Sequence, residues 1–183
     1  TYNIFHGYKA GFNATTPSFT IALGYSAVGS GLLTGNDNIT IGRQAGYDLT
    51  TGISNIFQGY LAGQNATTAN YTVAIGHGVI GLGLLTGTDN IAIGRNAGYD
   101  LTSGTYNVFQ GYYVAQNATI ADYTVAIGMQ AIGNGVLTGT DNIAIGQRAG
   151  YDLTSGQYNF FGGYYAGTNV TTGSHNVFQG FIA

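Results

Sequence analysis

The chain has 183 residues, of which 6% are charged and 44% are hydrophobic, and its formal net charge is −3. This hydrophobic content excludes a disordered chain, and only four Lys and Arg residues leave no basic footprint for nucleic acid. The 32 Gly, one Pro and no Cys exclude collagen and a disulfide framework, and no apolar run is long enough to span a membrane.

A five-residue motif recurs every 52 residues along the whole chain, starting at Asn3, Asn55, Asn107 and Asn159. Related motifs lie between these copies, at sub-spacings of 17, 18 and 17 residues. Such short periods are typical of solenoids, in which each repeat buries its apolar surface against the next. We therefore predict an all-β fold, a parallel β-solenoid (β-roll) of about 11 coils, with motif starts at residues 3, 20, 38, 55, 72, 90, 107, 124, 142, 159 and 176.

The coil at residues 90–106 illustrates the prediction. Ile91 and Ile93 alternate with smaller residues, which is the period of a half-buried strand, and Gly residues mark the corners. We expect two or three short strands in each coil and an aliphatic ladder of Ile and Val inside it. The Asn that opens most coils should form a polar ladder at a corner. At about 4.8 Å per coil, the rod should be roughly 50 Å long.

The three coil types within the 52-residue unit differ at the third motif position. Coils of the first type carry Phe there, whereas most other coils carry Ala. Because the third position should face away from the Ile ladder, we expect these Phe side chains to project outward and to pack against partner subunits. They are Phe5, Phe57, Phe109 and Phe161.

Coils of the second type have 18 residues, and the extra residue predicts a bulge beside Leu32, Leu84 and Val136. The order of coil types changes near the C-terminal end, where Asn176 opens a first-type coil directly after another one. We interpret residues 1–183 as one solenoid array, a window of a longer repetitive chain, with a candidate change of module in residues 159–183.

Acidic residues recur with the same period, but they do not predict catalysis. Identical copies in every unit argue against one catalytic pair, and surface solvation with corner hydrogen bonds is the simpler interpretation. Exposed ion pairs with the recurring Arg residues are an alternative. The histidines His6, His77 and His175 occupy unrelated coil positions. We therefore predict no enzyme, no catalytic residue, no metal site and no cofactor.

Tyrosines form two periodic columns, which offer two interpretations. Exposed aromatic rings can stack on sugars, so Tyr60, Tyr112, Tyr164, Tyr99 and Tyr151 are candidate carbohydrate contacts. The alternative, which we favour for any single column, is that the rings pack between subunits or along the coil surface.

The chain also contains sequons for N-linked glycosylation, four of them in one phased column. Each is a candidate acceptor if the chain is secreted by a suitable cell. Asn and Thr are also ordinary corner residues, so duplication of a corner accounts for the column equally well. The candidate asparagines are Asn13, Asn65, Asn117 and Asn169 in the column, with Asn38 and Asn70 outside it.

The motif Asn-x-Ala-Ile-Gly-x-x-Ala-Gly, followed by Thr-x-Gly, is represented by residues 142–150 and 154–156. It resembles the repeats of trimeric autotransporter adhesin heads and related repeats of bacteriophage tail fibres, over nearly the whole chain. The resemblance implies a left-handed parallel β-roll, assembled as a homotrimer in an extended surface or virion fibre. It implies no particular binding residue, because the motif residues are structural.

From these features we predict a structural or adhesive fibre segment, extracellular, at a cell surface or in a virion tail fibre, whose main partner is itself as a homotrimer or filament. One alternative is a carbohydrate-binding module that presents the Tyr columns to surface glycans. Another is an extracellular filament coated with N-glycans.

Overall fold

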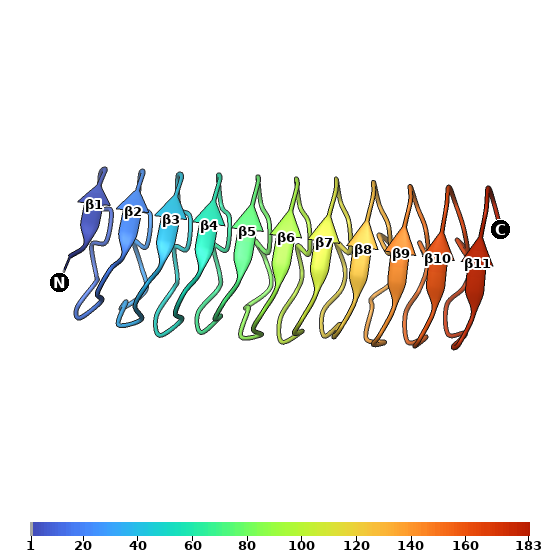
Figure 1. The fold of residues 1–183 in the computed structure, drawn as a ribbon. Coiled ribbons are helices and arrows are strands. Elements are labelled where there is room, and N and C mark those ends of the chain that lie inside the picture. Colours follow the sequence, from blue (N-terminus) through green and yellow to red (C-terminus); the bar gives the residue numbers. More distant parts are fainter. Residues whose placement is uncertain (1) are drawn as a thin grey trace.

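The computed structural model describes residues 2–183 and shows a single parallel β-sheet that runs the length of a rod (Figure 1). Eleven strands of three residues each are hydrogen-bonded in the order of the sequence. They are β1 (Ile4–His6), β2 (Ile21–Leu23), β3 (Ile39–Ile41), β4 (Ile56–Gln58), β5 (Val73–Ile75), β6 (Ile91–Ile93), β7 (Val108–Gln110), β8 (Val125–Ile127), β9 (Ile143–Ile145), β10 (Phe160–Gly162) and β11 (Val177–Gln179). The predicted β-solenoid is confirmed.

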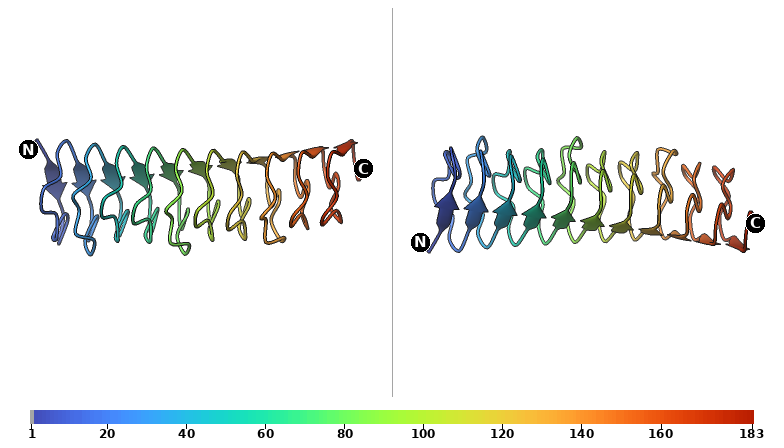
Figure 2. Two further views of the ribbon diagram at one scale, coloured as in Figure 1. Left: turned by 90° about the horizontal axis from the view of Figure 1, so that it is seen from below. Right: turned by 90° about the horizontal axis from the view of Figure 1, so that it is seen from above.

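Each coil contains one strand, rather than the two or three that the sequence suggested, and turns close the rest of the coil (Figure 2). Backbone hydrogen bonds still join successive coils outside the sheet. The amide of Gly98 donates to the carbonyl of Val114 at 3.0 Å, and the amide of Thr102 donates to that of Thr119 at 2.9 Å. The turns of successive coils are thus hydrogen-bonded almost like strands. Residues with positive φ, including the Gly corners, prevent a regular β-ladder there.

Like residues lie over like residues along the sheet, as predicted. Ile56 pairs with Val73, and Val73 pairs in turn with Ile91. The change in the order of coil types near the C-terminus leaves this register intact, because Phe161 of β10 pairs with Phe178 of β11. Their rings stack with centroids 5.5 Å apart.

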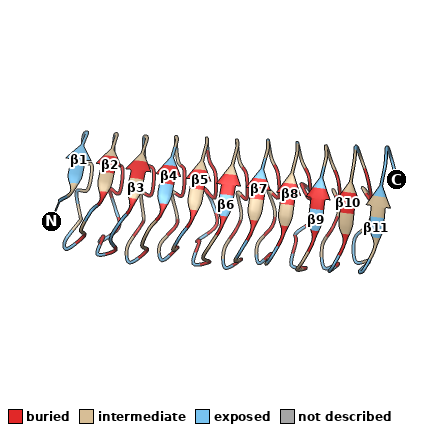
Figure 3. Cartoon of the chain, in the orientation of Figure 1, coloured by how far each residue is buried: buried red, intermediate tan, exposed pale blue. Residues whose placement is uncertain are grey.

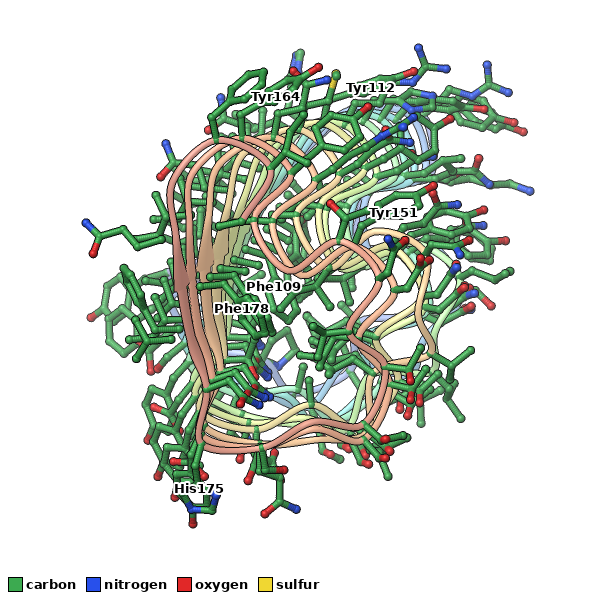
Figure 4. All side chains as sticks on the ribbon, turned by 90° about the vertical axis from the view of Figure 1, so that its right-hand side faces the viewer. Phe109, Tyr112, Tyr151, Tyr164, His175 and Phe178 are labelled. Carbon is green, nitrogen blue, oxygen red and sulfur yellow. The ribbon has the colours of Figure 1, made fainter. Side chains whose placement is uncertain are left out.

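The inward and outward directions of the strands are the reverse of our expectation (Figure 3). Ala92, at the third motif position, is fully buried inside the coil, whereas Ile91 is 40% exposed. The predicted subunit contacts Phe57, Phe109 and Phe161 are likewise fully buried within their own chain, and Phe109 points into the interior in Figure 4. Phe5, in the first coil, is 38% exposed, because β1 is an edge strand of the sheet.

Room for a Phe ring inside so thin a coil comes from glycines on the opposite wall. A Cβ added to Gly63 would lie 2.8 Å from the ring of Phe57, and one added to Gly46, in the preceding coil, would lie 3.1 Å from it. Second-type coils have the opposite arrangement, with Ala74 on the strand and the buried Ile80 on the far wall. Our sequence-based assignment failed because it considered the strand without the wall that faces it.

The predicted polar ladder at the start of the strands is confirmed, and it is buried. Asn55 Nδ2 donates to the carbonyl of Ala69 at 2.7 Å and to Asn38 Oδ1 at 3.0 Å. Asn55 Oδ1 accepts the amide of Thr72 at 3.0 Å. Each such side chain replaces backbone partners that a corner lacks, and these hydrogen bonds offset the cost of removing the amide from water.

The extra residue of the second-type coils forms the predicted bulge. The amides of Leu82 and Gly83 both donate to the carbonyl of Tyr99, at 3.0 and 3.1 Å. Two residues of this coil therefore face one residue of the next. As a result Leu84 is turned outward, while Leu85 is buried.

Candidate interaction surface

The outward side chains of the strands form a mostly apolar strip along the rod, which we call the outer sheet face. It consists of the first and third residues of β1–β11, and none of these is Asp, Glu, Lys or Arg. The first residue is Ile or Val in every strand except β10, where it is Phe160. The third residue is Leu or Ile in second- and third-type coils, and in first-type coils it is His6, Gln58, Gln110, Gly162 or Gln179. Most of these side chains are half-buried or exposed. A solvated sheet face normally carries polar side chains, so this strip has the composition of a contact surface.

One edge of the outer sheet face carries what we call the entry column, the residue directly before each motif. These residues all have positive φ, between 51° and 66°, and the aromatic ones stack in pairs. Tyr106 and Tyr123 have centroids 5.1 Å apart, and Tyr158 and His175 have centroids 5.0 Å apart. The column is Tyr2, Phe19, Asp37, Ser54, Tyr71, Asp89, Tyr106, Tyr123, Asp141, Tyr158 and His175.

The other edge carries the exit column, the residue directly after each motif. Here the third-type coils of the first two units supply an Arg where the entry column has an Asp, whereas that of the third unit supplies Gln147. The Arg43 guanidinium lies 5.7 Å from the Tyr25 ring centroid and 5.4 Å from that of Tyr60. Figure 4 shows Tyr112 and Tyr164 of this column at one end of the strands and His175 of the entry column at the other. The column is Tyr8, Tyr25, Arg43, Tyr60, His77, Arg95, Tyr112, Met129, Gln147, Tyr164 and Phe181.

The glycine that ends each motif fixes the sharp corner between the outer sheet face and the exit column. Gly94 has φ 131°, and a Cβ there would collide with the carbonyl oxygen of Gly111 in the next coil. Since every coil repeats this arrangement, the exit column projects from the same corner throughout the rod.

The arginines contact rings and neutral side chains rather than carboxylates within the described residues. Arg95 lies 5.7 Å from the Tyr112 ring centroid. Arg148, one residue further from its motif than Arg95, donates to Gln130 Oε1 at 2.9 Å and to the hydroxyl of Tyr165 at 2.7 Å. The alternative of ion pairs within one coil is therefore not supported.

The candidate carbohydrate contacts divide into two groups. Tyr60, Tyr112 and Tyr164 lie in the exit column, where neighbours occupy their ring faces: Tyr60 meets Arg43 and His77, and Tyr164 stacks on Phe181 at 5.0 Å. Tyr99 and Tyr151 are half-buried on the turn side of the coil (Figure 4 labels Tyr151). Neither group presents a row of free ring faces.

The entry column was not predicted from the sequence, although its pattern is visible there. The column is found by taking the residue before each motif start, which gives two aromatic residues and then Asp in successive coils of the first and third units.

The sequons differ in their access to solvent. Asn65 and Asn117 are half-buried, and each Nδ2 donates one hydrogen bond to the next coil, to the carbonyls of Leu82 and Asn134 at 3.0 Å. Asn13 makes the same kind of bond, Asn169 is exposed, and Asn70 is half-buried.

Asn38, by contrast, is fully buried, and its Nδ2 donates to the carbonyl of Gly52 at 2.8 Å. A glycan would replace one hydrogen of this amide and has no space beside it. Asn38 is therefore not an acceptor in the folded chain, which corrects the sequence-based suggestion.

The acidic residues form no metal site within residues 2–183, where no group of three His, Cys, Asp or Glu side chains lies close enough to hold an ion. Burial raises the pKa of the Asp100 carboxyl above its usual value. The hydroxyl of Thr88 donates to the Asp89 carboxylate at 2.8 Å, and that of Thr140 donates to Asp141 at 2.7 Å. Two entry-column acids are thus oriented by the residue before them.

Residues 2–183 contain no helix long and apolar enough to cross a membrane. Comparison with known proteins found no matching family model, no matching curated protein and no matching solved structure.

Proposed function

We propose that the chain is a rigid segment of a homotrimeric fibre, in which the outer sheet faces of three copies pack around a common axis. The observation that supports this most strongly is the apolar outer sheet face, which carries Ile or Val at nearly every rung. The outer sheet face is roughly 50 Å long and two side chains wide, with an aromatic column on each edge. Together they offer a contact area on the order of 800 Å² per copy, which is the area that each partner buries in a standard protein interface.

A second copy of the chain is the partner that fits this surface. The Ile and Val residues of this face repeat with the coil spacing, so another copy matches them along the whole length, whereas an unrelated globular protein would not. Three copies per fibre, left-handed winding, and an extracellular or virion location are what the resemblance to adhesin heads and tail fibres implies. This role requires no catalytic residue, cofactor or metal.

The subunit contacts in this proposal differ from those expected from the sequence. The Ile and Val residues of the outer sheet face take the place of Phe57, Phe109 and Phe161, which are buried within the chain. Carbohydrate binding and a coat of N-glycans remain alternatives, but the occupied ring faces of Tyr60 and Tyr164 give the first little support.

The test replaces outward residues in the middle of the rod by charges. Val73→Lys with Val108→Lys should leave the secondary structure unchanged in circular dichroism, because both side chains point away from the interior. We expect the mass measured by light scattering to fall from that of an oligomer to 18.9 kDa.

A matched control is Thr86→Lys, an exposed residue on the turn side of the same rod, which should leave the mass unchanged. A wild-type chain that is monomeric at high concentration would refute the proposed assembly.

A further inference from the structure

The third-type coils of the first two units carry opposite charges on the two edges of the outer sheet face. Asp37 precedes the motif and Arg43 follows it, and the next unit repeats this with Asp89 and Arg95. The strand between them runs across the rod (Figure 1), so the acid and the base of one coil lie at nearly the same height. They belong to opposite edges, because the strand separates the entry column from the exit column (Figure 4).

Symmetry then determines which edges meet. A rotation axis parallel to the rod leaves every coil at its own height and brings the entry column of one copy beside the exit column of its neighbour. In an antiparallel pair, related by an axis across the rod, entry column would meet entry column and acids would face acids or rings. Only the parallel arrangement in register places the Asp of one third-type coil beside the Arg of another.

We propose that copies of the chain associate in parallel and in axial register, with Asp37 and Asp89 of one copy binding Arg43 and Arg95 of its neighbour. This inference rests on the proposed assembly and adds its orientation and register. The Ile and Val residues at the first strand position repeat at nearly every coil, about 4.8 Å apart, so they would tolerate a shift by one coil. The third strand position carries Gln58 and Gln110 three coils apart, so its contacts would change on such a shift. The charges repeat only every third coil, and a shift by one coil would leave each Asp and each Arg at the rim unpaired.

Neighbouring side chains in the same chain already orient the charged groups for this contact. Tyr25 and Tyr60 hold the Arg43 guanidinium between their rings, which leaves its N–H edges free to bind a planar carboxylate. Thr88 orients the carboxylate of Asp89. The third unit has Gln147 in place of the exit-column Arg, so its Asp141 faces no Arg in this arrangement. Asp141 instead lines a shallow depression of about 450 Å³ together with Tyr158 and His175, at the border of the outer sheet face. This depression has room for a side chain from a neighbouring copy.

The experiment reverses the charges on one edge or on both. Variant A carries Asp37→Arg and Asp89→Arg, variant B carries Arg43→Asp and Arg95→Asp, and variant C carries all four changes. The positive φ at the Asp positions is no obstacle to Arg, because the same column accommodates Tyr71 and Tyr106. Analytical ultracentrifugation measures the assembly, and circular dichroism confirms that each variant is folded.

We expect variants A and B to assemble at least about tenfold more weakly than wild type, because like charges then face each other across the interface. Variant C should recover assembly with itself. Native mass spectrometry of wild type mixed with variant C should show two separate homo-oligomers, because mixed junctions would place like charges together.

Two results would overturn the inference. The first is an oligomeric wild type whose variants A and B assemble equally well, or whose mixture with variant C gives statistical hetero-oligomers; this would leave the proposed function standing. The second is a monomeric wild type, which refutes the proposed function as well. If variant C does not fold, the neutral variant with Asp37→Asn and Asp89→Asn tests the inference instead. Its assembly should lose the salt dependence that wild type shows, and an unchanged salt dependence would overturn the inference.

Discussion

The two sides of each strand follow different rules. Inward positions alternate between Phe and small residues with a period of three coils, and glycines or Ile on the opposite wall compensate for each change in volume. Outward positions carry Ile or Val on almost every rung and show no such alternation at the first strand residue. The same three-residue strand therefore belongs to two contact surfaces, one complete within the chain and one without a partner.

This difference explains the 52-residue unit. One Phe ring occupies space from two coils, its own and the preceding one, where Gly46, Gly98 and Gly150 contribute no side chain. A second-type coil fills itself with Ile80 or Ile132 on the far wall. The interior therefore repeats only after three coils, whereas the Ile or Val at the first outward position repeats at nearly every coil.

The largest expected effect comes from emptying the interior. Phe109→Ala should lower the free energy of unfolding by about 3–5 kcal/mol, because Gly98 provides nothing to fill the cavity. Urea denaturation followed by circular dichroism measures this loss, which should be the same at all protein concentrations.

Ile91→Ala, on the outward side of β6, is the matched control. Its cost should be under about 1 kcal/mol in dilute solution, where this side chain is partly exposed. The loss of unfolding free energy should grow as the protein concentration rises and copies associate. Equal and concentration-independent losses for both variants would remove the distinction between the two sides.

The next largest loss of stability should come from the buried Asn ladder. Asn107→Ala removes bonds to the backbone of Ala121 and Thr124 and to the side chain of Asn90. The loss should be about 2–3 kcal/mol, because buried partners are left unsatisfied. Asn65→Ala, which removes a single bond from a half-buried corner, should cost less than about 1 kcal/mol by the same principle. Thermal melts of both variants measure the difference.

A smaller effect should distinguish two equivalent threonines. The hydroxyl of Thr20 is buried without a hydrogen-bond partner, whereas that of Thr72 donates to the carbonyl of Asn70 at 3.1 Å. Thr20→Val should therefore stabilise the chain by about 1 kcal/mol, and Thr72→Val should destabilise it by a similar amount. Urea midpoints that shift in the same direction for both variants would contradict this account of the column.

The smallest effect concerns pH. Because burial raises the pKa of Asp100 in the folded chain, the folded state binds its proton more tightly than the unfolded state does. Ionisation thus lowers stability as the pH rises above the usual Asp range. Asp100→Asn should stabilise the chain at pH 7 by less than about 1 kcal/mol, and this gain should disappear near pH 3. A gain that persists at pH 3 would exclude ionisation as its cause.

The sequence predicted the coil length, the stacking of like residues, the Asn ladder and the bulge, because each of these depends on local spacing. It failed for the direction of Phe109 and Ile91, since alternation tells which residues share a side but not which side is inside. That choice depends on the wall across the coil, where Gly98 and the small side chain of Ala115 leave room for a ring. The entry column escaped notice because its residues differ from coil to coil.

Small-angle X-ray scattering of the wild-type chain tests the central claim most directly, because one curve gives both mass and length. The account predicts a mass about three times 18.9 kDa in a particle still roughly 50 Å long, as parallel rods in register require. A particle of the same length with the mass of one chain would contradict it.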